Sequence, residues 1–412
     1  MIKKILKSYD YTLIIAMVLL ILFGLIMIYS ASMVSAVQYY GEDSSDFFYK
    51  RQLKYIIIAG IAFVIVAIFP YKALLSNKIL VPMVFGSIIF LSGIFLFGSV
   101  FGNAQSWYKV GTASLQPAEF VKLGVIIYLS AIYSKKQAYI NEFNRGVVPP
   151  LAYLVIVCAL IILQPDFGTA AIIFMIGATV ILCSGMNWKN LSKLMLIGLA
   201  FLLLLVLILQ LAGKSIFTEK QMARIFVFLD SPFAEDVVQE SGYHMSNSLI
   251  AIGSGGLKGV GLGQGVQKLG YLTDGHTDFI MAVIAEELGI FGVGFVVVGL
   301  SYIVLRGIYT GLKCKDPFGS LLAIGISSMI GIQAFINIGG VSGLIPLTGV
   351  PLPFISYGGS SLLQLSIGMG ILVNVSMFVK YERVYKPKEE NVSDIAVKKQ
   401  PTSSFVRPNR HF

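Results

Sequence analysis

The sequence predicts an all-α membrane protein that crosses the bilayer ten times and carries a large extracytoplasmic loop between its seventh and eighth helices. Two observations support this prediction. Of the 412 residues, 56% are hydrophobic and only 13% are charged, whereas about 25% of the residues of a soluble domain are charged. Apolar stretches of about 20 residues, the length that crosses a bilayer, also recur along the chain. An ordinary soluble enzyme is therefore excluded.

Ten segments are long enough and poor enough in charge to be membrane spans. The first follows three lysines, as the apolar part of a signal peptide would, but it is longer than the about 7–15 residues of such a segment. We therefore expect it to remain as a membrane anchor. The predicted spans are 12–34, 53–69, 79–101, 117–134, 147–164, 167–186, 194–212, 279–305, 318–342 and 361–379.

The positive charges predict the orientation of these spans. An even number of spans places both termini on one side, and Lys and Arg concentrate in cytoplasmic segments. If the termini are cytoplasmic, most of the 31 Lys and Arg residues also fall in the cytoplasm. Topology then explains the formal net charge of +10. Because the loops show no basic stripe with interleaved aromatic residues, nucleic-acid binding is not expected.

Two regions lie outside the predicted helical array. The first is the end of the chain: residues 1–380 form the predicted transmembrane domain, and residues 381–412, which are rich in charged residues and serine, are predicted to be a disordered cytoplasmic tail. The predicted extracytoplasmic loop, 213–278, is far longer than the about 15 residues above which loops are usually functional or disordered. Its segment Ser246–Ile252 can form a short amphipathic helix on the membrane surface.

A few ionisable residues fall inside or beside the predicted spans, where a charge costs at least about 2.5–3.5 kcal/mol. Glu119 and Lys122 share a helix face and can neutralise each other, either as a structural pair or as a site for a charged headgroup. Asp166 follows a proline and can cap the next helix. Glu286 has a second glutamate beside it, so at least one of the two faces the protein interior. Arg51 opens the second span, where a long cationic side chain can reach the interface.

Asp278 differs from these residues because it lies where the long outer loop turns into the eighth span, directly after His276 and Thr277. A carboxylate at this position can cap the helix or interact with its dipole, although Thr277 or Asp274 can cap it equally well. An aspartate beside a histidine, next to a loop able to cover a substrate, is also a candidate general base.

Two further segments are irregular. The glycine-rich run Gly253–Gly265 fits neither the dinucleotide-binding pattern nor the Walker pattern. Together with Lys258 and Lys268 it can cradle a pyrophosphate through its N–H groups, or it is a simple mobile connector. The uncharged segment Pro346–Gly359 is tolerated at membrane depth only when it is buried in protein or lines a cavity. Three Cys and three His residues do not assemble a metal site from sequence.

Several of these segments resemble the signatures of the SEDS family (shape, elongation, division and sporulation proteins). The resemblance runs from about residue 10 to residue 380 in the order expected of the family. The motifs are Gln116-Pro117-x-Glu119-x-x-Lys122, Gln164–Thr169, Gly270–Leu272, His276–Ile280, Glu286–Gly289 and Gly343–Ser360. The segments Lys7–Tyr11, Tyr29–Ser32 and Phe48–Leu53 are most similar to the division branch of the family in Gram-positive rods, with the sporulation branch close to it.

The resemblance implies a ten-helix peptidoglycan glycosyltransferase that polymerises lipid II at the outer face of the bacterial cytoplasmic membrane, at the division septum. The family aspartate that matches Asp278 is the proposed base, and Arg51, Glu119, Lys122 and Asp166 match polar positions around the central cavity. The remaining candidates for substrate binding are His276, Lys258, Lys268, Glu286 and Ser356. Arg51, Lys122, Lys258 and Lys268, or a divalent cation such as Mg²⁺ or Mn²⁺, are candidates to stabilise the leaving pyrophosphate.

The resemblance also implies partners, namely a class B penicillin-binding protein, which is a transpeptidase, and the activators of the divisome. Two other functions stay open at this point. A lipid II flippase would use the charged residues inside the membrane, and a divisome scaffold would need no catalytic residue. The chain departs from the usual family pattern at Leu272-Thr273-Asp274-Gly275, where Leu-Pro-Glu is usual.

Overall fold

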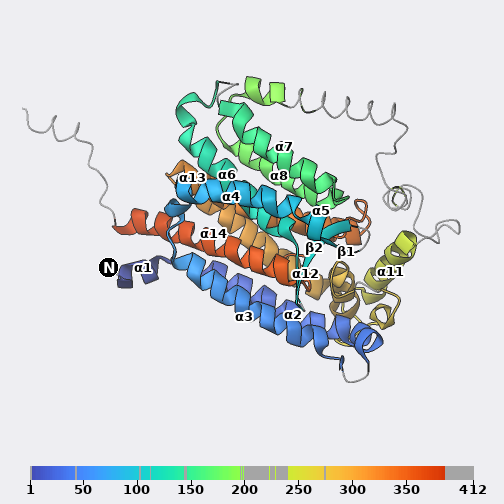
Figure 1. Cartoon of the computed structure of the whole chain (residues 1–412). Helices are drawn as coiled ribbons and strands as arrows, with labels where there is room; N and C mark the ends of the chain where they lie inside the picture. The colour runs from blue at the N-terminus through green and yellow to red at the C-terminus, as the bar shows by residue number, and fades with distance from the viewer. Residues whose placement is uncertain are drawn as a thin grey trace, which may run out of the picture.

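The computed structural model describes residues 2–41, 44–101, 104–111, 113–142, 146–194, 240–272 and 275–385, and the single positions 196, 198, 222 and 228. This part of the chain is a bundle of long helices with two different ends (Figure 1). One end holds α1 (Ile2–Ser8) and the C-terminal end of α14 (Gly359–Tyr385). There the Lys4 Nζ lies 5.2 Å from the centre of the Tyr385 ring. The other end holds a small β-sheet and α11 (Glu240–Gly255).

Nine of the ten predicted spans coincide with helices in the described part of the chain. Seven helices are long and apolar enough to cross a membrane, and two shorter apolar helices, α7 and α8, accompany them. The predicted span 194–212 and the first part of the following loop, 213–239, lie mostly outside the described residues, and the tail beyond Tyr385 lies wholly outside them. The helices are α2 (Tyr11–Tyr40), α3 (Phe47–Ile68), α4 (Asn77–Ser92), α6 (Pro117–Lys135), α7 (Val148–Ile162), α8 (Phe167–Cys183), α12 (Ile280–Lys313), α13 (Pro317–Val341) and α14.

Helices α6, α13 and α14 form the centre of the bundle. Most of their side chains are buried, whereas those of α3 and α4 are largely exposed, as expected where apolar surface faces lipid. Small residues bring the central helices close together. A Cβ on Gly325 of α13 would lie 2.7 Å from the Ile126 side chain of α6 and 3.0 Å from the Val180 side chain of α8.

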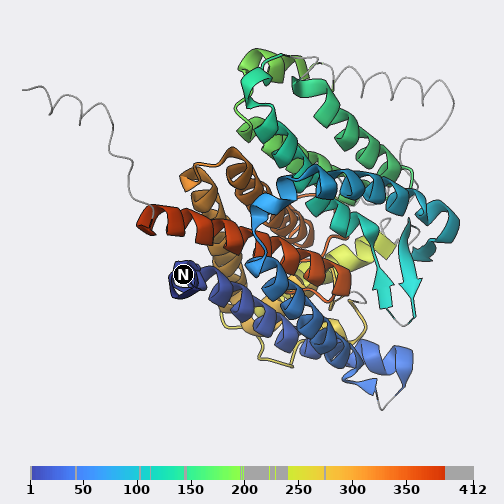
Figure 2. The same cartoon turned by 60° about the vertical axis from the view of Figure 1, so that its left-hand side comes forward.

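The prediction of an all-α chain is wrong for one segment, because three short antiparallel strands follow α4 and the single-turn helix α5 (Ile94–Phe97) (Figure 2). The third predicted span therefore ends before residue 101. The Tyr108 hydroxyl donates to the Phe90 carbonyl at 2.9 Å and lies 2.6 Å from the position that a Gly93 Cβ would take. The tyrosine ring stacks on Phe90, so the sheet packs over the end of α4. The strands are β1 (Ser99–Phe101), β2 (Ala104–Val110) and β3 (Ala113–Leu115).

Helix α12 consists of two helical segments. The sequence predicted one continuous span, 279–305, and did not predict the break between them. The break lies at Gly289, whose φ of 60° and ψ of −152° are not helical. A Cβ on Gly289 would lie 2.5 Å from the Gly259 nitrogen and 2.6 Å from the Leu257 oxygen. The glycine-rich run thus passes so close to the helix that only glycine fits at the break. The first segment, residues 280–288, follows directly after Asp278.

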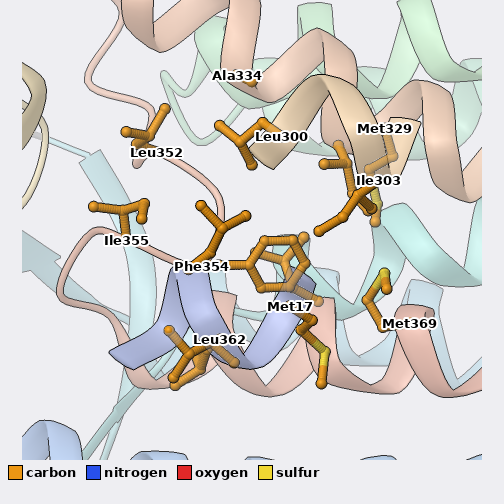
Figure 3. Packing of buried hydrophobic residues seen from close by; sticks show 14 of the residues in the cluster. Met17, Leu300, Ile303, Met329, Ala334, Leu352, Phe354, Ile355, Leu362 and Met369 are labelled. Atoms are coloured by element: carbon orange, nitrogen blue, oxygen red, sulfur yellow. The ribbon is translucent and has the colours of Figure 1, made fainter. Parts of the chain in front are cut away.

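The α13–α14 loop (residues 342–358) enters the bundle and does not lie on its surface. A Cβ on Gly24, near the middle of α2, would lie 2.8 Å from the Ile355 Cα. Phe354 and Ile355 are buried and pack with Leu352 among side chains of α2, α12, α13 and α14 (Figure 3). This agrees with the prediction that the irregular segment is buried in protein.

Helix α11 is longer than the predicted amphipathic helix Ser246–Ile252 and packs against the bundle. The Ser248 hydroxyl donates to the Val341 carbonyl at the end of α13 at 2.9 Å. The Asn247 amide donates to the Tyr271 carbonyl at 3.0 Å. A Cβ on Gly255 would meet the Ala285 carbonyl of α12. The described part of the predicted outer loop therefore forms a cover over the end of the bundle that holds Asp278.

Candidate active site

Asp278 lies directly before α12, at the end of the bundle that holds the sheet and α11. Its side chain is partly exposed, and its Oδ2 lies 3.3 Å from the position that a Gly349 Cβ would take. The N-cap position of α12 is Phe279, so Asp278 directly precedes the cap. Asp278 lines a small pocket, with no room for a water molecule, together with Ile336, Asn337, Gly340, Leu347, Thr348, Gly349 and Val350.

The residues before Asp278 are tied to the α13–α14 loop. The Ser356 hydroxyl donates to the Thr277 carbonyl at 2.6 Å and accepts from the Leu352 nitrogen at 2.8 Å. The Tyr357 nitrogen donates to the His276 carbonyl at 3.0 Å. Ser356 is buried, and these contacts place it as a link between the two segments. Its contact with a substrate stays a prediction.

His276 is buried among aromatic rings. Its ring centre lies 4.4 Å from that of Phe48 and 5.6 Å from that of Tyr357, and its Nδ1 has no hydrogen-bond partner among the described residues. Burial lowers the pKa of the imidazole from its ordinary 6.5 to about 4. At neutral pH His276 is therefore an uncharged packing group next to Asp278.

We expect the buried imidazole of His276 to make the folded protein sensitive to acid. Its pKa is lower in the folded state, so the unfolded state binds more protons between about pH 6.5 and pH 4, and the stability falls as the pH falls through this window. The full loss is roughly 3 kcal/mol, since one pKa unit corresponds to about 1.4 kcal/mol. Thermal unfolding in detergent at pH 7 and pH 5 should show a smaller pH-dependent drop in Tm for His276→Phe than for the wild type. Equal drops would contradict this expectation.

Glu119 and Lys122 form the predicted pair at the start of α6. The Lys122 Nζ lies 2.8 Å from the Glu119 Oε1, and both side chains are almost fully buried. The Glu119 Oε2 has no hydrogen-bond partner among the described residues. A buried pair of this kind is strongly destabilised when one partner is lost. The structure thus brings the pair together, and its contact with a charged headgroup stays a prediction.

Asp166 is the N-cap of α8, as predicted from its position after a proline. Its Oδ1 accepts from the Thr169 nitrogen at 3.1 Å, and its Oδ2 accepts from the Thr169 hydroxyl at 2.9 Å. The Gln116 amide, just before α6, also donates to Oδ2 at 3.3 Å. A Cβ on Gly168 would lie 3.2 Å from the Thr348 oxygen. The starts of α6 and α8 therefore lie beside the loop that faces Asp278.

Arg51, on the first turns of α3, lies on the other side of the same loop. Its Nε donates to the Tyr55 hydroxyl at 2.9 Å, and its guanidinium lies about 6 Å from the ring centres of Phe47 and Tyr55. The Gly358 nitrogen donates to the Gln52 Oε1 at 3.4 Å. Arg51 is partly exposed and is placed near the candidate site.

Glu286, Glu287, Lys268 and Ser30 form a buried cluster, here called the glutamate clasp. The Glu287 Oε1 lies 2.6 Å from the Lys268 Nζ and accepts from the Ser30 hydroxyl at 2.7 Å. The Glu287 Oε2 accepts from the Gly263 nitrogen at 3.0 Å. The Glu286 Oε1 accepts from the nitrogens of Val266 and Gln267 at 2.7 and 3.2 Å. The two glutamates thus hold the glycine-rich run on the first segment of α12.

The structure brings most, but not all, of the predicted site residues to one end of the bundle. Lys268 is committed to Glu287 and is almost fully buried, while Lys258 is exposed on the glycine-rich run. Among the described residues no group of three or more His, Cys, Asp or Glu side chains could hold a metal ion. The binding of a divalent cation therefore stays a prediction, and the described residues offer no cluster of ligands for it.

Sequence reasoning missed Asn337, which contacts the backbone of Asp278 from α13, and Ser30, which completes the glutamate clasp. One signal for Asn337 was present, because an amide inside an apolar span needs a partner. Ser30 lies in Tyr29–Ser32, a segment noted only for its resemblance to the division branch, and its partner Glu287 lies 257 positions away.

Fold and site together define a multi-helix membrane protein with a carboxylate in a small pocket at one end of its bundle. The chain matches the model of the FtsW, RodA and SpoVE family, described as cell cycle proteins, over residues 11–381. It therefore belongs to this family, the SEDS family.

Individual relatives extend this finding. The chain is 56% identical over 389 residues to the probable peptidoglycan glycosyltransferase FtsW of Bacillus subtilis, covering 94% of this chain and 96% of that protein. It is 40% identical to the stage V sporulation protein E of the same organism, over 91% of this chain and 98% of the relative. The preference for the division branch over the sporulation branch agrees with these values.

Solved structures share the fold. A chain from the structure titled "Structural coordination of polymerization and crosslinking by a peptidoglycan synthase complex" aligns with a TM-score of 0.71 at 23% identity, over 92% of this chain and 99% of that one. The rod shape determining protein RodA of Thermus thermophilus aligns with a TM-score of 0.62 at 23% identity, over 89% of this chain and 96% of that one.

Proposed function

We propose that this protein is a peptidoglycan glycosyltransferase that polymerises lipid II into glycan strands at the outer face of the cytoplasmic membrane. The observation that carries the proposal is the position of Asp278, a partly exposed carboxylate in a pocket walled by the α13–α14 loop. Membership of the SEDS family and 56% identity to a relative named as this enzyme support it.

In the proposed reaction the Asp278 carboxylate takes the proton from the 4-hydroxyl of the acceptor N-acetylglucosamine. The hydroxyl oxygen attacks the anomeric carbon of the donor strand, the bond to the pyrophosphate breaks, and undecaprenyl pyrophosphate leaves with its electron pair. One base is sufficient for this inverting displacement, because the leaving group is already an anion and needs no proton. Arg51 is the first cation that we assign to the leaving pyrophosphate, since it is partly exposed whereas the Lys122 and Lys268 side chains are almost fully buried.

The proposed topology has ten spans with both termini in the cytoplasm. Nine helices of the described part and the predicted span 194–212 make up the ten. The two terminal segments at one end of the bundle support an even number of spans, and the distribution of Lys and Arg supports the orientation. Asp278 then faces the extracytoplasmic side, where lipid II is polymerised.

The partners that we propose are a class B penicillin-binding protein and the divisome activators, at the division septum. The family resemblance of the sequence motifs supports these partners, and a chain from a peptidoglycan synthase complex shares the fold. They were implied by the sequence motifs and need direct tests of binding and location.

A lipid II flippase is the second candidate, favoured by the buried Glu119–Lys122 pair inside the membrane. Purified protein with its transpeptidase partner in vesicles containing labelled lipid II separates the two functions. We expect glycan polymer on a gel, whereas translocated lipid II without polymer would overturn the proposal. A pure scaffold would give neither product.

A further inference from the structure

Asn337, near the C-terminal end of α13, connects two distant segments of the candidate site. Its side chain is only 3% exposed. Its Nδ2 donates to the Asp278 carbonyl at 2.8 Å and to the Val350 carbonyl at 2.7 Å. One amide thus holds the peptide group that follows Asp278 and the peptide group that follows Val350, and Val350 is the chain neighbour of Gly349, the residue beside the Asp278 carboxylate.

The orientation of this amide follows from its partners. Both neighbouring oxygens are backbone carbonyls, which only accept hydrogen bonds, so the NH₂ group must face them. The Asn337 Oδ1 then points elsewhere and has no hydrogen-bond partner among the described residues. A buried acceptor without a partner costs about 1–3 kcal/mol. The contribution of this amide to the site therefore lies in the two hydrogen bonds that its NH₂ group donates.

Asn374 of α14 shows the arrangement that serves the fold alone. It is also fully buried, but both ends of its amide are satisfied. Its Nδ2 donates to the Ala67 carbonyl at 2.6 Å, and its Oδ1 accepts from the Tyr71 nitrogen at 2.9 Å. These contacts tie α14 to the chain after α3, away from the pocket of Asp278.

We propose that Asn337 is a positioning residue for Asp278. By holding two peptide groups it fixes the carboxylate against the Gly349 wall of the pocket, where the acceptor hydroxyl must lose its proton. This inference rests on the proposed function, because it assumes that Asp278 is the base. Misplacement of a reacting group by about 1 Å can lower a rate about a hundredfold. Loss of the two hydrogen bonds from Asn337 should therefore lower kcat and leave the KM for lipid II nearly unchanged.

The test compares Asn337→Leu, Asn337→Asp and the matched control Asn374→Leu in a polymerisation assay, with rates normalised to folded protein. We expect both Asn337 variants to lose about tenfold to a hundredfold in kcat, with KM within about threefold. Leu has a similar volume but cannot donate, and Asp keeps size and polarity but has no N–H, so one variant remains informative if the other fails to fold. Asn374→Leu should lower Tm and leave kcat within about twofold.

Two results would overturn the inference, namely full kcat in a folded Asn337 variant, or an equal loss of kcat in Asn374→Leu. Asp278→Asn, measured in parallel, separates this failure from failure of the proposed function. If Asp278→Asn is inactive while the Asn337 variants are fully active, only the positioning role falls. If Asp278→Asn is active, the proposed function falls with it.

Discussion

Asp278→Asn is expected to lower the rate of lipid II polymerisation by about 10²–10⁴-fold, the usual contribution of a general base. Asparagine keeps the size of the side chain but cannot take a proton at neutral pH. Because Asp278 is partly exposed and asparagine has the same shape, Tm should change little. The measurement is the rate of glycan formation from labelled lipid II by the purified protein with its partner.

The control for this variant is Asp316→Asn, the same chemical change at the start of α13. Asp316 is an N-cap whose Oδ2 accepts from the Gly319 nitrogen at 3.2 Å and from the Tyr71 hydroxyl at 2.9 Å. This variant should lose stability and keep its rate per folded molecule. A rate for Asp278→Asn within tenfold of the wild type would show that Asp278 is not the base.

The sequence predicted the spans well because their signal is local. A helix that faces lipid needs only a long apolar run, and the bounds of nine predicted spans overlap the observed helices. The errors lie where distant segments meet. The break in α12 depends on the backbone of Gly259 and Leu257, and the end of α4 depends on Tyr108, contacts that no local pattern predicts.

For the candidate site too, residues with a local signal were predicted, and their partners from distant segments were not. Asp278, Glu119 with Lys122, and Asp166 were found from their position at helix starts or from their spacing on one helix. The partner of Lys268 was not found, because Glu287 lies 19 residues away and across a turn of the chain. Lys268, just after the glycine-rich run, suggested a pyrophosphate ligand; the structure shows it in a buried ion pair, and its contact with a pyrophosphate stays a prediction.

Lys268→Met is expected to destabilise the protein by about 3–5 kcal/mol, because it leaves the fully buried Glu287 carboxylate without a countercharge. The hydrogen bonds from Ser30 and from the Gly263 nitrogen remain, but they do not neutralise it. The glycine-rich run should then detach from α12. Thermal unfolding measures the loss of stability, and hydrogen exchange of the peptide covering 259–272 measures the detachment.

The double variant Lys268→Met/Glu287→Leu shows whether charge or packing causes this loss. Replacing both members of a buried pair by apolar residues is often neutral or stabilising, so Tm should recover most of the loss. Because the N–H of Gly263 then has no acceptor, exchange in 259–272 should stay fast. The exposed pair Lys50–Asp46 provides the comparison, since Lys50→Met should cost at most about 1 kcal/mol. If Lys268→Met were as mild as Lys50→Met, the ion pair would not hold the run, and the Glu286 hydrogen bonds and the close approach at Gly289 would have to do so.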